Sequence, residues 1–272
     1  VLVGERAVLA TLPLSRGERI SIADCPAGIF SVEEQLRVPR AIPGDVELLW
    51  APQFNIPVLR RGRLLVTIHD VLHLAMPGFM DGWYRRMYAR ALLAAVRAKA
   101  DQVIADSRFT ADELIRLVGI DAARIEVIHL GVDASWYSVE RSPRPHGKPY
   151  FVFVGNVKAH KNVRGLIAAF GALKEKLPHD LVIVGKKEGF VTGDREVERL
   201  SAALGERVKF TGRVDDELLK RYVACAEALV LPSFYEGFGL PPLEAMACAC
   251  PAVVSTRASL PEVCGDAALY CD

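Results

Sequence analysis

The sequence predicts an α/β protein built from two doubly wound parallel sheets, and three features of its 272 residues carry this prediction. Short apolar runs alternate with segments of helical periodicity along the chain, a pattern typical of parallel strands joined by helices. A polar stretch with three prolines, residues 138–149, interrupts this alternation near the middle of the chain. The alternation then restarts at 151–155, so we expect one sheet on each side of a linker.

We assign residues 1–140 to a first domain, 141–149 to the linker and 150–272 to a second domain. Strands of the first domain are expected at 19–23, 46–50, 64–68, 102–105 and 124–130. Capping boxes at Ser31 and Thr110 are expected to begin two helices, the first interrupted by Pro39 and the second closed by Gly119. A third helix, rich in alanine and arginine, is expected over 81–99.

The second domain repeats this organisation. Its strands are expected at 151–155, 181–184, 208–211, 228–231 and 251–255. Asn162 and Asp215 are expected to cap two of the intervening helices, and a further helix is expected over 195–204.

The stretch 228–262 has the order of a strand, a loop, a helix and a second strand. The loop runs from Ser233 to Gly239, and Pro241 and Pro242 lie in the first turn of the helix, where N–H groups are not needed. Backbone N–H groups at a helix N-terminus bind anions. This stretch therefore predicts an anion site made of backbone.

Composition narrows the class of protein. A net charge of +1 gives no basic footprint for nucleic acid, and no apolar run is long enough to span a bilayer. The N-terminus has neither a basic region nor a cleavage site, so we expect no signal peptide and a cytoplasmic location. The six cysteines are interpreted as reduced, packed thiols, because Cys248 and Cys250 have no histidine or second pair that would complete a zinc site.

Polar residues follow several of the expected strands, where parallel sheets bind their ligands. In the first domain these residues are His69, Asp70, Asp106, Ser107 and Arg108. In the second domain they are Gly155, Asn156, Lys158, Lys161, Arg213, Val214 and the segment 236–239. Glycines let a ligand lie against the backbone, and lysines supply charge for phosphate.

Glu236 and Glu244 are eight residues apart, one in the loop and one in the helix that follows it. Carboxylates repel phosphate but accept hydrogen bonds from sugar hydroxyls, as in dinucleotide sites. Glu244 could also favour the helix N-terminus through the helix dipole, whereas Glu236 lies in a loop of glycines and aromatics. A molecule with a central diphosphate between hydroxyl-rich groups would satisfy the lysines and both carboxylates.

Several motifs resemble those of one enzyme family. In the second domain they are Phe151-Val-Phe-Val-Gly-Asn-Val-Lys-Ala-His-Lys-Asn162, Ser233-Phe-Tyr-Glu-Gly-Phe-Gly-Leu-Pro-Pro-Leu-Glu-Ala-Met-Ala247 and Ser259-Leu-Pro-Glu-Val263. In the first domain they are Thr67-Ile-His-Asp70, Ser107-Arg-Phe-Thr110 and Leu130-Gly-Val-Asp133. On these motifs the chain resembles the retaining nucleotide-sugar glycosyltransferases of family 4, and especially the mannosyltransferase-like members of bacterial surface polysaccharide and lipopolysaccharide assembly. The resemblance implies a GT-B fold, in which two Rossmann-like domains face a cleft.

The resemblance also implies roles for individual residues. Glu236 would contact the transferred sugar and Glu244 the nucleotide ribose, while the amides of Gly239 and Leu240 hold the diphosphate. Lys161 would neutralise that diphosphate. The base would rest on backbone around 213–214, and a histidine of the first domain, His69, would reach the donor sugar from the opposite side.

The implied site residues fall into three sets. The predicted catalytic residues are Glu236, His69 and Lys161. The predicted donor-binding residues are Gly155, Asn156, Lys161, Arg213, Val214, Glu236, Gly237, Phe238, Gly239, Leu240 and Glu244. Candidates on the acceptor side, which could equally cap or close turns, are Asp70, Ser107 and Arg108. We expect no metal, since no D-x-D pair follows a strand, and no cofactor besides the nucleotide-sugar substrate, GDP-mannose or a UDP-hexose.

The implied reaction transfers a hexose, with mannose favoured, to a glycan or lipid-linked glycan with retention of configuration. The leaving phosphate can take the acceptor's proton, so no protein nucleophile is required and catalysis rests on positioning and charge stabilisation. Two departures from the family pattern stand out. Asn156 occupies a position where many relatives carry an arginine, and the family's early glycine-rich loop and its returning helix are expected to lie beyond Val1 and Asp272.

Two alternatives stay open at the level of sequence. One is another GT-B enzyme, such as an epimerase or a phosphorylase, against which the pair of glutamates and its flanking motif argue. The other is a non-catalytic or degenerate nucleotide-sugar-binding subunit.

A basic face is expected on the helix Trp83–Lys99, from Arg85, Arg86, Arg90, Arg97 and Lys99. We interpret this face as solvated surface, with peripheral contact to the anionic inner face of the cytoplasmic membrane as the alternative. Four histidines are interpreted as structural, namely His73, His129, His160 and His179. Lys158 is interpreted either as a solvated lysine or as a helper of Lys161.

Overall fold

A computed structural model describes residues 1–12, 19–79, 82–185 and 195–272 of the chain. Contacts divide the chain into two compact units, each of which contains more than one segment. The first unit comprises Val1–His69, Gly82–Ala105 and Ala111–Val127. The second comprises Asp70–Asp81, Asp106–Thr110 and Ile128–Asp272, so two short segments from the first half of the chain pack with the second half.

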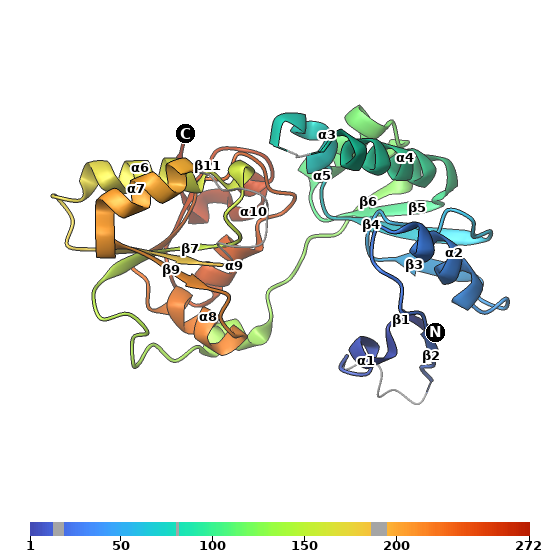
Figure 1. Ribbon diagram of the computed structural model, residues 1–272, viewed down its shortest axis with the longest axis horizontal. Helices are drawn as coiled ribbons and strands as arrows, with labels where there is room; N and C mark the ends of the chain where they lie inside the picture. Colours follow the sequence, from blue (N-terminus) through green and yellow to red (C-terminus); the bar gives the residue numbers. More distant parts are fainter. Residues whose placement is uncertain (13–18, 80–81, 186–194) are drawn as a thin grey trace. The chain divides into compact units, whose positions relative to one another are not determined.

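The first unit is built on a parallel four-stranded sheet with the order β3-β4-β5-β6 (Figure 1). Its strands are β3 (Leu48–Ala51), β4 (Arg63–Ile68), β5 (Gln102–Ala105) and β6 (Ile125–Val127). A separate parallel pair is formed by β1 (Leu2–Gly4) and β2 (Ile22–Asp24), with α1 (Arg6–Leu9) between them. The strands at 64–68 and 102–105 carry buried apolar residues as predicted. The strand expected at 19–23 corresponds to β2 and belongs to the separate pair, not to the four-stranded sheet.

Helix α4 (Trp83–Lys99) covers this sheet with an apolar stripe of Ala89, Leu92, Leu93 and Val96, all buried. The helix was expected to begin at Asp81, which lies outside the described residues. The other helical segments of the unit are α2 (Val32–Ala41), the second half of α5 (Arg108–Glu113) with its π-helical continuation (Leu114–Val118), and a 3-10 turn (Ala122–Arg124).

Two expectations about helix ends are wrong. Pro39 does not interrupt α2, because it lies in the last turn, where one missing N–H costs little and the helix ends two residues later. The expected cap at Ser31 is present, with its hydroxyl accepting from the N–H of Glu34 at 3.0 Å. Helix α5 begins before Thr110, because Ser107 supplies the capping hydroxyl and accepts from the N–H of Thr110 at 3.0 Å.

The second unit is built on a six-stranded parallel sheet with the order β12-β11-β10-β7-β8-β9. Its strands are β7 (Tyr150–Val154), β8 (Asp180–Val184), β9 (Val208–Gly212), β10 (Ala228–Leu231), β11 (Ala252–Ser255) and β12 (Leu269–Cys271). The chain builds outward from β7 in one direction through β9 and then returns to add β10 on the other side of β7. The strand order therefore reverses between β7 and β10, and loops leaving their carboxyl ends diverge there.

Helices cover both faces of this sheet, with α6 (Val163–Leu173) and α7 (Arg195–Leu204) on one side and α8 (Asp216–Ala224) and α9 (Leu240–Ala247) on the other (Figure 1). The expected caps are present, since Asn162 accepts from the N–H of Gly165 and Asp215 from that of Leu218. The remaining helical segments of the unit are α3 (Leu72–Ala75), α10 (Leu260–Cys264) and short 3-10 turns at Pro77–Phe79, Ala134–Ser138, Ala159–Lys161, Gly205–Arg207 and Gly265–Ala267.

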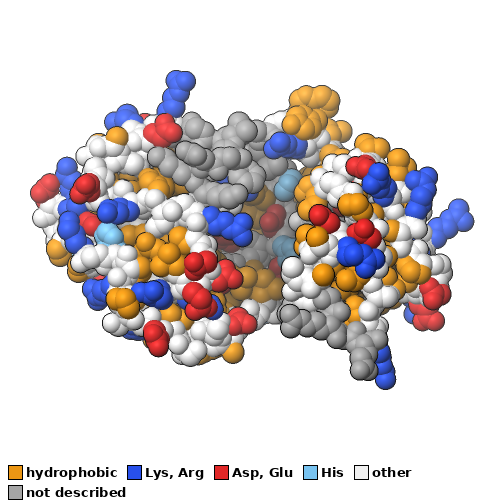
Figure 2. All heavy atoms as spheres, turned by 60° about the horizontal axis from the view of Figure 1, so that its bottom comes forward, with side chains coloured by type: hydrophobic (Ala, Val, Ile, Leu, Met, Phe, Trp, Pro, Cys, Tyr) orange, Lys and Arg blue, Asp and Glu red, His pale blue; other side chains and the backbone are white. Residues whose placement is uncertain are grey.

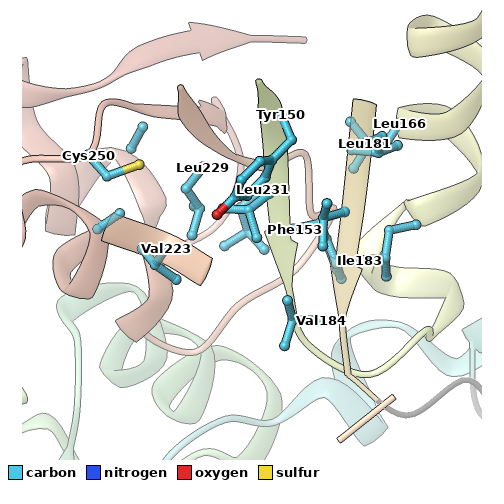
Figure 3. Packing of buried hydrophobic residues seen from close by; sticks show 14 of the residues in the cluster. Tyr150, Phe153, Leu166, Leu181, Ile183, Val184, Val223, Leu229, Leu231 and Cys250 are labelled. Atoms are coloured by element: carbon cyan, nitrogen blue, oxygen red, sulfur yellow. The ribbon is translucent and has the colours of Figure 1, made fainter. Parts of the chain in front are cut away.

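The core of the second unit lies between the central strands and these helices, and Figure 3 shows Phe153, Leu229 and Leu231 packed at its centre. Five of the six cysteines are buried and all six are free, as expected for packed thiols. Among the described residues, no helix combines the length and the apolar character needed to cross a bilayer. On the face seen in Figure 2, basic and acidic side chains are interspersed, in keeping with the net charge of +1.

Candidate active site

The candidate site lies where the strand order of the second unit reverses. The loop after β7 carries Lys161 and the loop after β10 carries Glu236, and these two strands are neighbours in the sheet. Ligands of open parallel sheets bind at such a reversal, beyond the carboxyl ends of the strands. Two residues 75 positions apart in the chain therefore meet at one end of the sheet.

Lys161 and Glu236 form an ion pair, with Nζ and Oε1 2.7 Å apart. Their side chains are only 18% and 13% exposed, so the pair is largely desolvated. The hydroxyl of Ser233, itself fully buried, donates to the same carboxylate oxygen at 2.7 Å. Hydrogen bonds to an ionised group are among the stronger ones in proteins. Glu236 is thus held in one orientation as a carboxylate.

Two glycines allow close packing at this site. The first lies against Lys161 and the second against the backbone of the first. Gly155 has a φ of +143°, and a Cβ on it would lie 3.2 Å from Cδ of Lys161. Gly185 has a φ of +150°, and its Cβ would meet the carbonyl oxygen of Gly155 at 2.1 Å. No side chain fits at the second position without moving backbone. Asn156, the next residue after the first glycine, is half-buried beside it.

The loop before α9 has its carbonyl groups bound by buried hydroxyls. Ser259 shares its one hydroxyl proton between the carbonyls of Glu236 and Phe238, at 2.9 and 2.8 Å. Ser107 and Thr110 both donate to the carbonyl of Gly237, at 2.6 and 3.0 Å. The backbone of the loop is therefore fixed by side chains from two other segments of the chain.

Helix α9 begins directly after this loop. Gly239 is its N-cap residue with a φ of +101°, and a Cβ on it would lie 2.6 Å from the side chain of Leu260. The first N–H groups of a helix have no intrahelical acceptor, so those of Gly239 and Leu240 remain available to an anion. Pro241 and Pro242 follow and have no N–H to offer.

Glu244 lies one turn further along α9 and is half-buried. Burial raises the pKa of its carboxyl above the usual value, and the nearby charge of Asp216 raises it further. Within the part of the chain that the structure describes, its carboxylate has no hydrogen-bond or cation partner. A half-buried acceptor without a protein donor is suited to hydroxyl groups of a ligand.

Arg213 and Val214 follow β9 at the same end of the sheet. Arg213 is exposed, while Val214 packs on the edge of the core. Phe238 is buried, with its ring 5.8 Å from that of His129. The donor-binding roles expected for the three residues stay predictions.

His69 belongs to the first unit, where it follows β4. It is exposed, and one ring nitrogen lies 3.0 Å from the carbonyl oxygen of Pro52. Asp70 accepts from the N–H of Leu72 at 2.9 Å, which closes a turn. The sugar-contacting role of His69 and the acceptor-side role of Asp70 stay predictions.

The acceptor-side residues Ser107 and Arg108 have different surroundings. Ser107 is fully buried and its hydroxyl donates to the carbonyl of Gly237, so it supports the loop, and its acceptor-side role stays a prediction. Arg108 has an exposed side chain, and its N–H donates to a carboxylate oxygen of Glu262 at 2.7 Å.

Glu262 is a residue that sequence reasoning missed. It lies in α10 and accepts from the N–H groups of Arg108 and Phe109, which are the first amides of α5, and from His129 at 2.8 Å. Burial opposes its ionisation, but these three donors outweigh it and hold the pKa of Glu262 below the usual value. Its position in the Ser259-Leu-Pro-Glu motif was the only signal in the sequence.

His160 precedes Lys161 in a 3-10 turn and is buried. Burial, followed by the positive charge of Lys161, lowers the pKa of His160 from its ordinary 6.5 to about 4. The imidazole is therefore neutral at pH 7, which fits the structural role expected for it. Among the described residues, no cluster of three or more histidine, cysteine, aspartate or glutamate side chains is arranged to hold a metal.

The buried His160 predicts a loss of stability in mild acid. Its folded-state pKa of about 4 lies below the ordinary 6.5, so the unfolded chain binds the proton more readily between these values. Unfolding free energy should be unaffected above pH 6.5 and fall by up to about 3 kcal/mol as the pH drops toward 4. Urea unfolding across this range measures the loss. His160→Asn should remove most of this slope, and an unchanged slope in the variant would contradict the assignment.

The two parallel-sheet units and the site at the strand-order reversal define an α/β protein of the GT-B class. A solved structure of this class supports the same conclusion, that of Alr3699/HepE from Anabaena in complex with UDP and glucose. It matches with a TM-score of 0.70 at 21% identity, over 92% of this chain and 71% of that chain. The likeness confirms the predicted GT-B fold.

The chain belongs to the family 4 glycosyltransferases. Residues 136–270 match the family described as Glycosyl transferases group 1, and residues 43–136 match Glycosyltransferase Family 4. The O-antigen chain mannosyltransferase B of Escherichia coli is 32% identical over 236 residues, which are 81% of this chain and 60% of the relative. The O-antigen chain mannosyltransferase RfbU of Salmonella typhimurium is 29% identical over 227 residues, 84% of this chain and 61% of the relative. The chain thus spans about three fifths of the length of these curated relatives.

Proposed function

We propose that the protein is a retaining glycosyltransferase that moves a hexose from a nucleotide-sugar to a glycan or lipid-linked glycan. The sugar we favour is mannose, because the relatives named above are mannosyltransferases of O-antigen chains. The donor is then GDP-mannose, with a UDP-hexose as the other candidate because a structural neighbour holds UDP and glucose. We retain the domain boundary at 141–149 as part of this proposal.

One observation carries the proposal, namely the paired Lys161 and Glu236 beside the free amides of α9. A cation 2.7 Å from a carboxylate, next to a helix N-terminus, offers one group for phosphate and one for sugar hydroxyls. Glu244 adds a second acceptor one turn along the same helix, which we assign to the ribose hydroxyls. A diphosphate on the amides would compete with Glu236 for the ammonium group of Lys161.

The proposed reaction forms one bond and breaks one at the anomeric carbon. The acceptor hydroxyl oxygen bonds to that carbon on the face from which the diphosphate leaves, and the electron pair of the broken bond goes to the departing phosphate oxygen. That phosphate also takes the acceptor's proton. Lys161 and the amides of Gly239 and Leu240 stabilise the charge that develops on the diphosphate, and Glu236 orients the sugar.

Transfer and its stereochemistry can be tested together. The purified protein is incubated with radiolabelled GDP-mannose or UDP-hexose and with lipid-linked saccharides extracted from bacterial membranes. With GDP-mannose we expect label in the lipid fraction that an α-mannosidase releases and a β-mannosidase does not, because the donor is the α-anomer and configuration is retained. With a UDP-hexose the α- and β-glycosidases of that hexose take their place. Release by the β-enzyme alone would contradict retention, and donor hydrolysis or epimerisation without transfer would contradict the reaction class.

We further propose that α4 contacts the surface of an anionic membrane. Its exposed side includes Trp83, Tyr84 and Met87, which are 72%, 57% and 57% exposed, together with the arginine Arg90. Trp83, Met87 and Arg90 recur at helical spacing and therefore share one face. Aromatic and basic side chains on one helix face are typical of helices that lie in a membrane interface. A face that is merely solvated has no need of an exposed tryptophan.

Not every basic residue of α4 is available for this contact. Lys99 donates to the carbonyl oxygen of Val58, and the guanidinium of Arg97 packs where a Cβ on Gly119 would lie, 3.3 Å away. The contact therefore rests on the N-terminal half of the helix.

Co-sedimentation with phosphatidylglycerol vesicles tests the membrane contact. Arg85→Gln with Arg90→Gln, two exposed arginines of α4, should weaken vesicle binding about 10- to 30-fold at low salt, since each basic residue near an anionic surface contributes about 1 kcal/mol. Arg61→Gln with Arg63→Gln, two exposed arginines outside α4, is the matched control and should bind as the parent protein does. Equal binding by both variants, or binding indifferent to anionic lipid, would remove the proposal.

A further inference from the structure

Three buried hydroxyl groups hold the loop before α9 by its carbonyl oxygens. Ser107, Thr110 and Ser259 are each 0% exposed. Between them they donate to three successive carbonyls of the segment 236–238, over distances of 2.6 to 3.0 Å. Buried carbonyls normally find a donor, and helices or strands usually supply it. Here side chains from two other segments supply it at every one of three consecutive residues.

The direction of each carbonyl also sets the direction of the N–H group that follows it. The peptide bonds of 236–239 are trans, and in a trans peptide the C=O of one residue and the N–H of the next point in opposite directions. Carbonyls of Glu236, Gly237 and Phe238 that point toward buried hydroxyls direct the N–H groups of residues 237–239 the other way. These three amides directly precede that of Leu240, the first residue of the helix. Consecutive amides on one side of a loop form an anion nest.

We infer that Ser107, Thr110 and Ser259 are positioning residues that orient the amides of 237–239 toward the diphosphate of the donor. The inference rests on the proposed function for the identity of the anion, and adds the groups that preorganise its binding site. Preorganised donors act strongly because no reorientation is needed when the charged group arrives.

The supporting hydroxyls are themselves fixed. Glu262 accepts from the N–H groups of Arg108 and Phe109, at 2.7 and 3.0 Å, and so anchors the segment that carries Ser107 and Thr110. Ser259 lies three residues before Glu262, at the start of the same helix α10. Helix α10 therefore supports the loop in two ways. The hydroxyl of Ser259 contacts the loop directly, and the carboxylate of Glu262 holds the segment that carries Ser107 and Thr110. The hydroxyl of Ser107 also accepts from the N–H of Thr110.

Two variants that differ by one hydroxyl test the inference. Ser107→Ala/Thr110→Val removes both donors to the carbonyl of Gly237, whereas Ser107→Ala alone keeps the hydroxyl of Thr110, which valine replaces with a methyl group of similar size. Both variants lose the cap on the N–H of Thr110, so that effect cancels in the comparison. We expect the first variant to bind GDP or UDP, whichever the parent protein prefers, about 10-fold more weakly than the second, as for one buried hydrogen bond. Calorimetric titration measures both affinities.

A second measurement, the affinity for the nucleoside without phosphate, separates a loss of oriented amides from a general loss of structure. The affinity for the phosphate-free nucleoside, followed by ligand-observed NMR, should be equal in the two variants, because the oriented amides face phosphate and not the base. Ser259→Ala should also weaken diphosphate binding about 10-fold, again by one buried hydrogen bond. Ser201→Ala, which removes a comparable serine-to-carbonyl bond in α7, should change nothing.

The outcomes separate this inference from the proposed function. If the parent protein binds a nucleoside diphosphate but the two hydroxyl variants bind it equally well, the inference is wrong and the proposed function stands. A nucleoside affinity that falls with the diphosphate affinity also overturns the inference. If the parent protein binds no nucleoside diphosphate at all, the proposed function fails and the inference fails with it. Should the valine variant not fold, the comparison of Ser259→Ala with Ser201→Ala decides between the same outcomes.

Discussion

Replacing Glu236 with alanine is expected to abolish glycosyl transfer, with a fall in turnover of about 1,000-fold or more. The carboxylate is fixed by Lys161 at 2.7 Å and by the hydroxyl of Ser233 at 2.7 Å. In the proposed mechanism it orients the sugar at the point where the bond to the diphosphate breaks. A steady-state assay with the preferred donor measures the effect, beside a thermal unfolding curve that reports on the fold.

Glu236→Gln sharpens this test, because the amide keeps the shape of the side chain and can still accept from Lys161 and Ser233. The variant should unfold close to the parent temperature and yet transfer sugar far more slowly, since the charge is gone. Glu217→Gln, an exposed carboxamide substitution on α8, is the control and should be fully active. Full turnover of Glu236→Ala on the true donor would show the mechanism to be wrong.

Replacing Lys161 with alanine is expected to weaken binding of the nucleoside diphosphate about 30- to 100-fold, the cost of losing a charge-assisted contact to phosphate. The effect should shrink as salt is added, because the lost interaction is between charges. Lys161→Ala should also lower the free energy of unfolding, because it leaves the largely buried charge of Glu236 without its cation. Glu236, only 13% exposed, would keep Ser233 as a donor but lose its cation.

A double variant separates these two consequences of Lys161→Ala. Lys161→Ala/Glu236→Gln removes the unpaired charge and should recover part of the stability lost in the single variant, without recovering diphosphate affinity. Lys220→Ala removes one positive charge of similar exposure, 14%, from the same unit, where its partner Glu217 is exposed to solvent, and serves as the control. Unchanged diphosphate affinity in Lys161→Ala would mean that this lysine is only the structural partner of Glu236.

Local patterns in the sequence predicted most of the fold. Apolar runs identified the strands of the four-stranded sheet and five of the six strands of the second unit, but not the edge strand β12. The caps at Asn162 and Asp215 set helix starts that the structure confirms. Helix α9 begins at Leu240 and ends at Ala247 as its prolines and periodicity indicate. These features depend on interactions within a few residues, which a sequence displays directly. Where two capping hydroxyls lay three residues apart, at Ser107 and Thr110, the pattern could not tell which one began the helix.

The candidate site was predicted less completely, because its contacts join distant residues. Sequence reasoning named Lys161 and Glu236 separately, but their ion pair depends on β7 and β10 being neighbours in the sheet. The bond from Ser107 to the carbonyl of Gly237 spans 130 residues. Glu262 had no periodicity or spacing to mark it, since its partners are backbone amides of another helix. Such contacts depend on strand order and tertiary packing, which the spacing of residues within one segment does not predict.

The central claim is that the amides before α9, Lys161 and Glu244 together hold a nucleoside diphosphate. Calorimetric titration of the purified protein with GDP, UDP and dTDP tests it most directly, with Glu244→Ala titrated in parallel. We expect one of the three to bind with a Kd in the range of about 1 to 100 μM, and at least 10-fold more weakly to the variant. Binding of none of the three at millimolar concentration, or equal binding to the parent protein and to Glu244→Ala, would contradict the account.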